Sequence, residues 1–205
     1  MYFTDENNTR RKVCCEQQHF NIDYKNTDIT KFSIINVLNG RSENLSTNMR
    51  KLETNANSRI MIYINSHGGD EFLRIRWKSV MFHEEINRTL WEMYEKKRYK
   101  EILLVIDGCK VFSLNEYITA PNIYFVGSTL KTQLGYSYLF DNVLLTQLSD
   151  KFTFKFAELL EKKLEFPEKV TNLDDFFEVL NDFAFLNANV GVRNGLNRQV
   201  INFLM

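Results

Sequence analysis

Two runs of bulky apolar residues stand out along the chain, each followed directly by glycine and polar residues. The first covers Arg59–Asn65 and ends before His-Gly-Gly, and the second covers Glu101–Asp107 and ends before Gly-Cys. Continuous apolar runs of this length are typical of strands buried on both faces, as in parallel sheets. A third run, Asn122–Ser128, has the same character. We therefore expect three buried strands in these segments.

Helical periodicity is clearest between the first two strands. In Glu84–Arg98, the apolar residues Ile86, Leu90, Met93 and Tyr94 fall on one face, and Glu92 lies one turn before Lys96 on the other. Four further helices and one alternating strand are also predicted. They are the helices Thr27–Leu38, Ser113–Ile118, Lys151–Leu164 and Asn172–Asn181, and the strand Phe72–Trp77.

The helix over Thr27–Leu38 has recognisable ends. Asn26 or Thr27 can cap its start and Gly40 can end it. The residues predicted to share its apolar face are Ile29, Phe32, Ile35 and Leu38.

Strands alternating with helices predict an α/β fold with a mostly parallel sheet and helices on both faces. The chain has 205 residues, only two prolines and eight glycines, and no low-complexity tract at which to divide it. We expect one domain over residues 1–205.

Composition narrows the classes of partner. Basic and acidic residues both number 26, so the formal net charge is zero and gives no electrostatic reason to expect nucleic acid as a partner. No apolar run approaches the ~18 residues that a membrane span needs, and the polar start of the chain does not resemble a signal peptide. The three cysteines, Cys14, Cys15 and Cys109, form no CxxC pair, which excludes a zinc knuckle or a thioredoxin motif.

Candidate chemistry lies where the predicted strands end. His67 follows the first strand, Cys109 follows the second, and Ser128-Thr129 closes the third. Ligands of open α/β sheets bind beyond the carboxyl ends of the strands, so neighbouring strands would bring these residues to one rim. There an imidazole can lower the pKa of a thiol or take its proton, and the thiolate can attack a carbonyl. The backbone N–H groups of Gly68 and Cys109 are candidates for the oxyanion hole.

Simpler interpretations exist for each of these residues. A cysteine after a buried strand is most often a small core residue, and a histidine before Gly-Gly can merely cap a turn. The other histidines have weaker claims, because His19 lies in a polar segment and His83 opens a helix in an acidic, solvated context. Cys14 and Cys15 follow basic residues that could activate a thiol, but no strand end supports them.

A longer pattern links these residues to a known family. The segments Ile60-Met-Ile-Tyr, His67-Gly-Gly-Asp-Glu-Phe-Leu, Leu90-Trp-Glu-Met and Glu101-Ile-Leu-Leu-Val-Ile-Asp-Gly-Cys109 resemble the catalytic subunits of GPI-anchor transamidases, a group of legumain-like, caspase-fold cysteine peptidases. The interval from His67 to Cys109 (109 − 67 = 42) agrees with that family without a gap. Weaker matches extend the resemblance over nearly the whole chain, including Thr171-Asn-Leu-Asp-Asp-Phe-Phe.

The resemblance implies a caspase-like three-layer fold and a function. His67 would be the general base and Cys109 the nucleophile, with Ser128 and Thr129 contacting substrate. The enzyme would cut the C-terminal signal of a secretory proprotein, hold the new C-terminus as a thioester on Cys109, and pass it to the ethanolamine amine of a GPI lipid. The implied location is the lumenal side of the endoplasmic reticulum membrane, among the other transamidase subunits, and no cofactor is implied.

The chain departs from the family pattern at several positions around the cleft. Ser66 stands where the family has Gly, Gly108 where it has Thr, and Gln133-Leu134-Gly135 where it has acidic residues. A family segment that can hold calcium corresponds to Asn21 and Asp23 here, with one ligand lost, so the resemblance implies at most weak calcium binding near Asp23. The family's first strand and helix, which carry an Asn that orients the catalytic His, precede Met1, and we expect Met1 to be an internal residue of a longer protein.

The sequence also bears on three alternatives to a transamidase. A legumain-type endopeptidase would hydrolyse after Asn, but the Trp-Glu-Met and Lys-Arg-Tyr segments resemble the transamidase branch more closely. A true caspase is disfavoured because Gly108-Cys109-Lys110 does not match its nucleophile motif. A non-catalytic structural relative is favoured by the bulky Val111-Phe112 and disfavoured by the retained His67 and Cys109.

Overall fold

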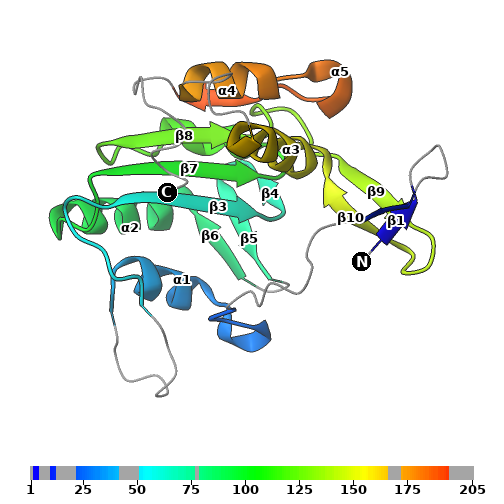
Figure 1. Ribbon diagram of the computed structural model, residues 1–205. Coiled ribbons are helices and arrows are strands. Elements are labelled where there is room, and N and C mark those ends of the chain that lie inside the picture. Colours follow the sequence, from blue (N-terminus) through cyan, green and yellow to red (C-terminus); the bar gives the residue numbers. More distant parts are fainter. Residues whose placement is uncertain are drawn as a thin grey trace.

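The centre of the molecule is a four-stranded sheet. The structure describes residues 2–4, 10–12, 22–41, 51–76, 79–165 and 172–193. The strands are β3 (Arg59–Asn65), β7 (Glu101–Asp107), β8 (Ile123–Gly127) and β11 (Gly191–Arg193), in the order β11-β8-β7-β3. In the computed structural model of Figure 1, β8, β7 and β3 lie one below the other. These three are mutually parallel and β11 is antiparallel, which confirms the expected mostly parallel sheet.

The two apolar runs form strands with the predicted bounds. β3 and β7 pair over their whole length, from Arg59↔Glu101 to Asn65↔Asp107. All seven residues of β7 are buried, because strands flank it on both sides and side chains cover both faces. β3 forms the outer edge of this sheet among the described residues, and most of its side chains are only partly buried.

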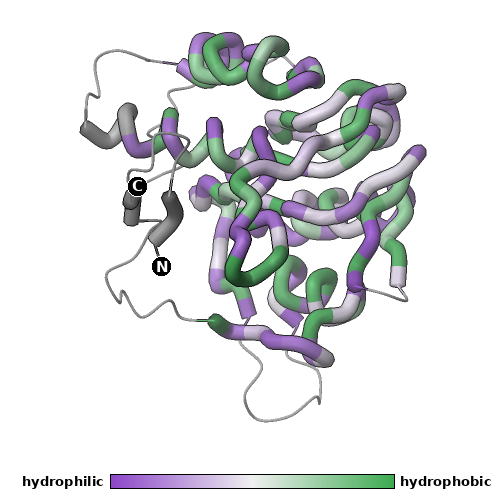
Figure 2. Tube along the Cα trace, turned by 90° about the vertical axis from the view of Figure 1, so that its right-hand side faces the viewer, coloured by the Kyte–Doolittle hydropathy of each residue, from purple (hydrophilic) through white to green (hydrophobic). Residues whose placement is uncertain are grey.

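Helices and a second sheet cover the two faces of this central sheet, giving three layers. On one face pack α2 (His83–Glu95), the 3-10 helix η2 (Val111–Glu116) and a small antiparallel sheet of β4 (Gly68–Gly69), β5 (Phe72–Ile75) and β6 (Ser79–Phe82). On the other pack α3 (Lys151–Glu165), α4 (Leu173–Leu180) and α5 (Phe183–Leu186). Figure 2 shows the alternation of apolar and polar positions along these elements.

The first helix starts later than its periodicity predicts. A 3-10 turn, η1, covers Asn26–Asp28, and α1 covers Lys31–Leu38. Thr30 caps α1, because its hydroxyl accepts from the Ser33 backbone N–H at 3.0 Å while the Ser33 hydroxyl accepts from Thr30 N–H at 2.8 Å. The prediction that Phe32 faces the core is wrong, since its side chain is 66% exposed.

The helix α2 keeps its predicted inner face with one exception. Ile86, Leu90 and Met93 are buried, whereas Tyr94, near the C-terminal end of the helix, is 39% exposed. The expected ion pair forms between Lys96 Nζ and Glu92 Oε1 at 2.8 Å.

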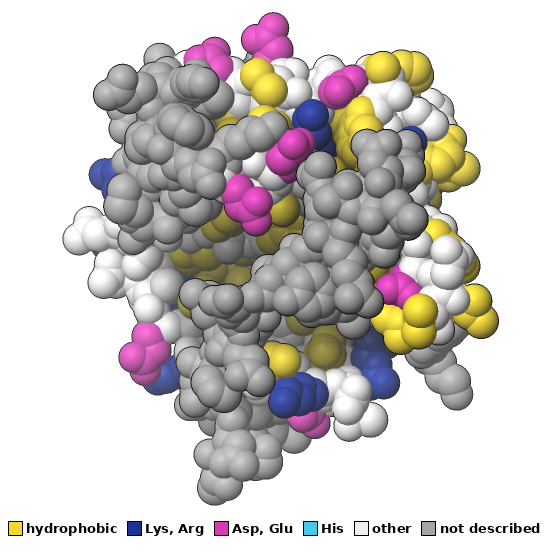
Figure 3. All heavy atoms as spheres, turned by 45° about the vertical axis from the view of Figure 1, so that its right-hand side comes forward, with side chains coloured by type: hydrophobic (Ala, Val, Ile, Leu, Met, Phe, Trp, Pro, Cys, Tyr) yellow, Lys and Arg dark blue, Asp and Glu magenta, His cyan; other side chains and the backbone are white. Residues whose placement is uncertain are grey.

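Two hairpins, with both of their strands, were not predicted, and neither were β4, β6 and β11. β1 (Tyr2–Thr4) pairs with β2 (Arg10–Lys12), and β9 (Ser137–Asp141) pairs with β10 (Thr146–Asp150). The β9–β10 turn is fixed by Asp141 Oδ1, which accepts from the N–H groups of Val143 and Leu144 at 2.8 Å each. Val143 at this turn is 91% exposed, more than any other large hydrophobic residue described. Figure 3 shows hydrophobic side chains at several places on the surface.

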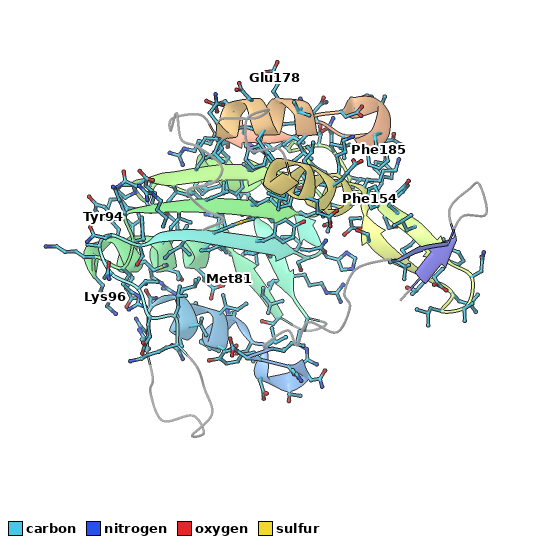
Figure 4. The ribbon with its side chains drawn as sticks, viewed as in Figure 1. Met81, Tyr94, Lys96, Phe154, Glu178 and Phe185 are labelled. Carbon is cyan, nitrogen blue, oxygen red and sulfur yellow. The ribbon has the colours of Figure 1, made fainter. Side chains whose placement is uncertain are left out.

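The base of the β9–β10 hairpin is anchored to the helical layer by aromatic contacts. The Tyr138 ring lies 5.0 Å from the Phe154 ring of α3 and 5.2 Å from the Phe185 ring of α5, between centroids. Figure 4 labels Phe154 and Phe185 where these elements meet. Edge-to-face and tilted arrangements of this kind stabilise aromatic pairs. The hairpin base is therefore held beside the carboxyl ends of the parallel strands.

Candidate active site

His67 and Cys109 line the same cavity, at the carboxyl ends of two hydrogen-bonded strands. The pairing of β3 with β7 ends at Asn65↔Asp107, and Ser66 N–H extends it by donating to the Asp107 carbonyl at 3.0 Å. Two residues further along each chain segment lie His67 and Cys109. The cavity has a volume of about 540 Å³, and the His67 side chain is exposed while that of Cys109 is half-buried.

Glycines allow the two loops to come into backbone contact. A Cβ added to Gly68 would lie 2.5 Å from the Cys109 carbonyl oxygen, and one added to Gly108 would lie 2.2 Å from the Ser66 carbonyl oxygen. Real Cβ atoms do not approach oxygen so closely, so both positions require glycine in this conformation. Gly68 and Cys109, expected to form the oxyanion hole, are thus brought side by side, and that role stays a prediction.

Gly135 contacts the thiol and was not predicted. Its N–H donates to Cys109 Sγ at 3.4 Å, and a Cβ placed on it would lie 3.3 Å from the Gly108 carbonyl oxygen. The glycine itself, in the segment that departs from the family pattern, was the available signal.

Ser128 and Thr129 lie at the end of β8, as expected, but their side chains do not line the cavity. They are 2% and 1% exposed. Ser128 Oγ accepts from Gly108 N–H at 3.0 Å, while Thr129 Oγ1 donates to the Gly108 carbonyl at 2.8 Å and accepts from Val111 N–H at 3.2 Å. These hydroxyls support the loop that carries Cys109, and the expected contact with substrate stays a prediction.

A hydrogen-bonded polar cluster forms the floor of the cavity. The buried Asp107 carboxylate accepts from the Thr153 hydroxyl at 2.6 Å, and Asn65 Nδ2 donates to Asp150 Oδ2 at 2.8 Å and to Thr153 Oγ1 at 2.9 Å. Burial raises the pKa of Asp107 above its ordinary value, and the nearby Asp150 charge acts in the same direction. Burial likewise raises the pKa of Tyr63, whose hydroxyl lies 2.6 Å from Thr153 Oγ1.

Basic side chains from strand β5 of the second sheet and from the residue after it also line the cavity. Arg74 of β5 and the following Arg76 line the cavity together with Asp107 and Asp150. A ligand in this space therefore meets both basic and acidic side chains.

The remaining candidate residues lie away from this cavity or outside the described ranges. His83 is not solvated as expected, because its side chain is 18% exposed and its ring stacks on Tyr117 at 3.9 Å between centroids. His19, Cys14 and Cys15 lie outside the described residues, as does Asn21 beside Asp23. Within the described ranges, no group of three or more His, Cys, Asp or Glu residues is placed to hold a metal ion, and no helix is both long and apolar enough to cross a membrane.

Comparison with known proteins finds GPI-anchor transamidases among the relatives of the chain. The chain is 30% identical to a putative GPI-anchor transamidase of Drosophila melanogaster over 93% of its own length and 53% of that protein. It is 32% identical to the GPI-anchor transamidase of Saccharomyces cerevisiae, over 85% of the chain and 42% of the relative, and 30% identical to that of Homo sapiens, over 77% and 40%. The chain thus spans about half the length of the curated relatives it matches, or less.

The fold is also found among solved structures. Caspase-1 from Spodoptera frugiperda superposes with a TM-score of 0.55 at 10% identity, covering 84% of this chain and 70% of that one. This confirms the caspase-like arrangement expected from the sequence. The model of the peptidase C13 family matches residues 8–186. With the relatives and the fold in agreement, the chain belongs to the peptidase C13 family of cysteine peptidases.

Proposed function

We propose that this chain is the catalytic component of a GPI-anchor transamidase, with Cys109 as nucleophile and His67 as general base. The observation that carries the proposal is the shared cavity, in which a thiol and an imidazole follow the paired ends of β3 and β7. The names of the relatives supply the reaction class.

The first half of the proposed reaction is acyl transfer to sulfur. The Cys109 thiolate attacks the scissile carbonyl carbon of a C-terminal signal, and the backbone N–H groups of Gly68 and Cys109 stabilise the oxyanion. The C–N bond breaks, His67 gives its proton to the leaving amine, and the new C-terminus remains as a thioester on Cys109.

The second half distinguishes a transferase from a hydrolase. The ethanolamine amine of a GPI lipid attacks the thioester carbonyl while His67 takes a proton from it, and the C–S bond breaks to restore the thiolate. We place this activity at the lumenal side of the endoplasmic reticulum membrane, with the other transamidase subunits as partners.

The proposal is tested by complementation. Cells lacking their own transamidase catalytic subunit should regain a GPI-anchored reporter at the surface when they express the protein, and should not regain it with His67→Ala at equal protein level. Rescue by both forms would overturn the catalytic role of His67. Failure of both, in cells whose remaining subunits come from the same species as the chain, would favour a non-catalytic relative.

A further inference from the structure

The segments that follow His67 and Cys109 touch a second time, away from the sheet. After His67 the chain forms the β4–β5 hairpin, and after Cys109 it forms η2. Ser113 of η2 is 1% exposed and contacts the turn of that hairpin. Its hydroxyl accepts from Glu71 N–H at 2.9 Å and donates to the Gly69 carbonyl at 3.3 Å. One buried hydroxyl thus satisfies two backbone groups of the opposite loop.

Side chains of Tyr117, which follows η2, and of His83, the first residue of α2, add to this contact. The Tyr117 hydroxyl donates to Glu71 Oε1 at 2.5 Å, and the His83 ring stacks on Tyr117. Glu71 has a φ of 69°, a left-handed conformation that costs free energy in a residue other than glycine. Both Ser113 and Tyr117 form hydrogen bonds with this residue.

One ion pair also joins the two segments, but it contributes little to holding them together. Lys110 Nζ lies 3.2 Å from Asp70 Oδ2, with side chains 35% and 69% exposed. Ion pairs between exposed groups are screened by solvent and have small effects. The buried Ser113 hydroxyl is therefore the main tie at this point.

The two ties enclose the candidate catalytic residues. The β3–β7 pairing fixes the two segments just before His67 and Cys109, at Asn65↔Asp107. Ser113 fixes them just after, two residues beyond His67 at Gly69 and four residues beyond Cys109. Neither segment can shift along the other without breaking a backbone pair at one end or a buried hydrogen bond at the other.

We propose that Ser113 is a positioning residue that holds the loop of His67 against the loop of Cys109. This inference rests on the proposed dyad of His67 and Cys109. Loss of the hydroxyl would remove its hydrogen bonds to Glu71 N–H and to the Gly69 carbonyl, and so free the hairpin to move relative to η2. In the proposed dyad, the imidazole of His67 would then no longer be held in a fixed position relative to the thiol of Cys109.

Alkylation of Cys109 by iodoacetamide tests this without any substrate. Its rate is followed against pH by peptide mass spectrometry, which separates Cys109 from Cys14 and Cys15. In Ser113→Ala, the midpoint of the pH profile should rise by about one pH unit, and the rate at neutral pH should fall several-fold, because less thiolate is present. Tyr117→Phe, which loses the bond to Glu71 but keeps the ring, should shift the midpoint in the same direction by less.

A matched control separates positioning from general loss of stability. Thr89 is also buried, 3% exposed, but its hydroxyl donates to Glu85 O within α2 at 2.7 Å and ties no loops together. Thr89→Val should leave the midpoint unchanged. An unchanged midpoint in both Ser113→Ala and Tyr117→Phe, or an equal shift in Thr89→Val, would overturn the inference.

His67→Ala distinguishes this inference from the proposed function. A shift in His67→Ala without a shift in the Ser113 and Tyr117 variants contradicts only the role of Ser113. No shift in His67→Ala contradicts the dyad, and the role of Ser113 with it.

Discussion

Cys109→Ala should abolish cleavage of a peptide that carries a C-terminal attachment signal, lowering kcat/KM by about 10⁴-fold or more, since loss of a catalytic nucleophile removes the covalent route altogether. The substitution removes the sulfur that accepts from Gly135 N–H and adds no bulk. The fold should therefore persist, which a urea unfolding curve measures alongside the kinetics.

A small loss of activity in a folded Cys109→Ala protein would contradict the assignment. Cys109→Ser offers a second check, because a hydroxyl in the same place is a far weaker nucleophile than a thiolate. Its activity should also fall to near the background, with substrate binding retained.

Gly68→Ala should have the second largest effect, through the backbone. The new Cβ would meet the Cys109 carbonyl oxygen, which is part of the nucleophile loop and cannot rotate away. Overpacking of this kind costs about 1–3 kcal/mol of stability. A displacement of about 1 Å between reacting groups can lower the rate about 10²-fold. Both are measured, by urea unfolding and by peptide cleavage.

Gly69→Ala is the matched control for that variant. Its Cβ would meet the ring of Phe72, a side chain that can turn aside, instead of backbone. We expect Gly69→Ala to keep most of the activity. Equal activity in Gly68→Ala and Gly69→Ala would show that the close approach of the two loops is not needed.

The strands were predictable because their signal is local. β3 and β7 have the bounds that their apolar runs predicted, since burial on both faces requires unbroken apolar sequence. The start of α1 was misplaced, because Asn26, Thr27 and Thr30 are all residue types that cap helices, and Thr30 is the cap through its capping box with Ser33. The β9–β10 hairpin carries no clean alternation, and its anchor, Tyr138, depends on rings from two distant helices.

Some residues of the candidate site could likewise be named from the sequence, and others could not. His67 and Cys109 could be named from their place after buried strands, and the structure puts both on one cavity. The positions of Ser113 and Gly135 depend on contacts between segments that are 26 to 44 residues apart in the chain. Spacing alone does not predict such contacts, nor that Ser128 and Thr129 turn their hydroxyls toward the Cys109 loop.

The central claim is that Cys109 carries the acyl group to an amine. The most direct measurement is intact-mass spectrometry of the protein after acid quenching with a peptide substrate, with and without hydroxylamine as a soluble amine. We predict an acyl adduct mapped to Cys109 that disappears when hydroxylamine is added, with the cleaved peptide recovered as its hydroxamate. Cleavage by the wild-type protein with no adduct on Cys109, or hydroxamate formation by Cys109→Ala, would contradict it.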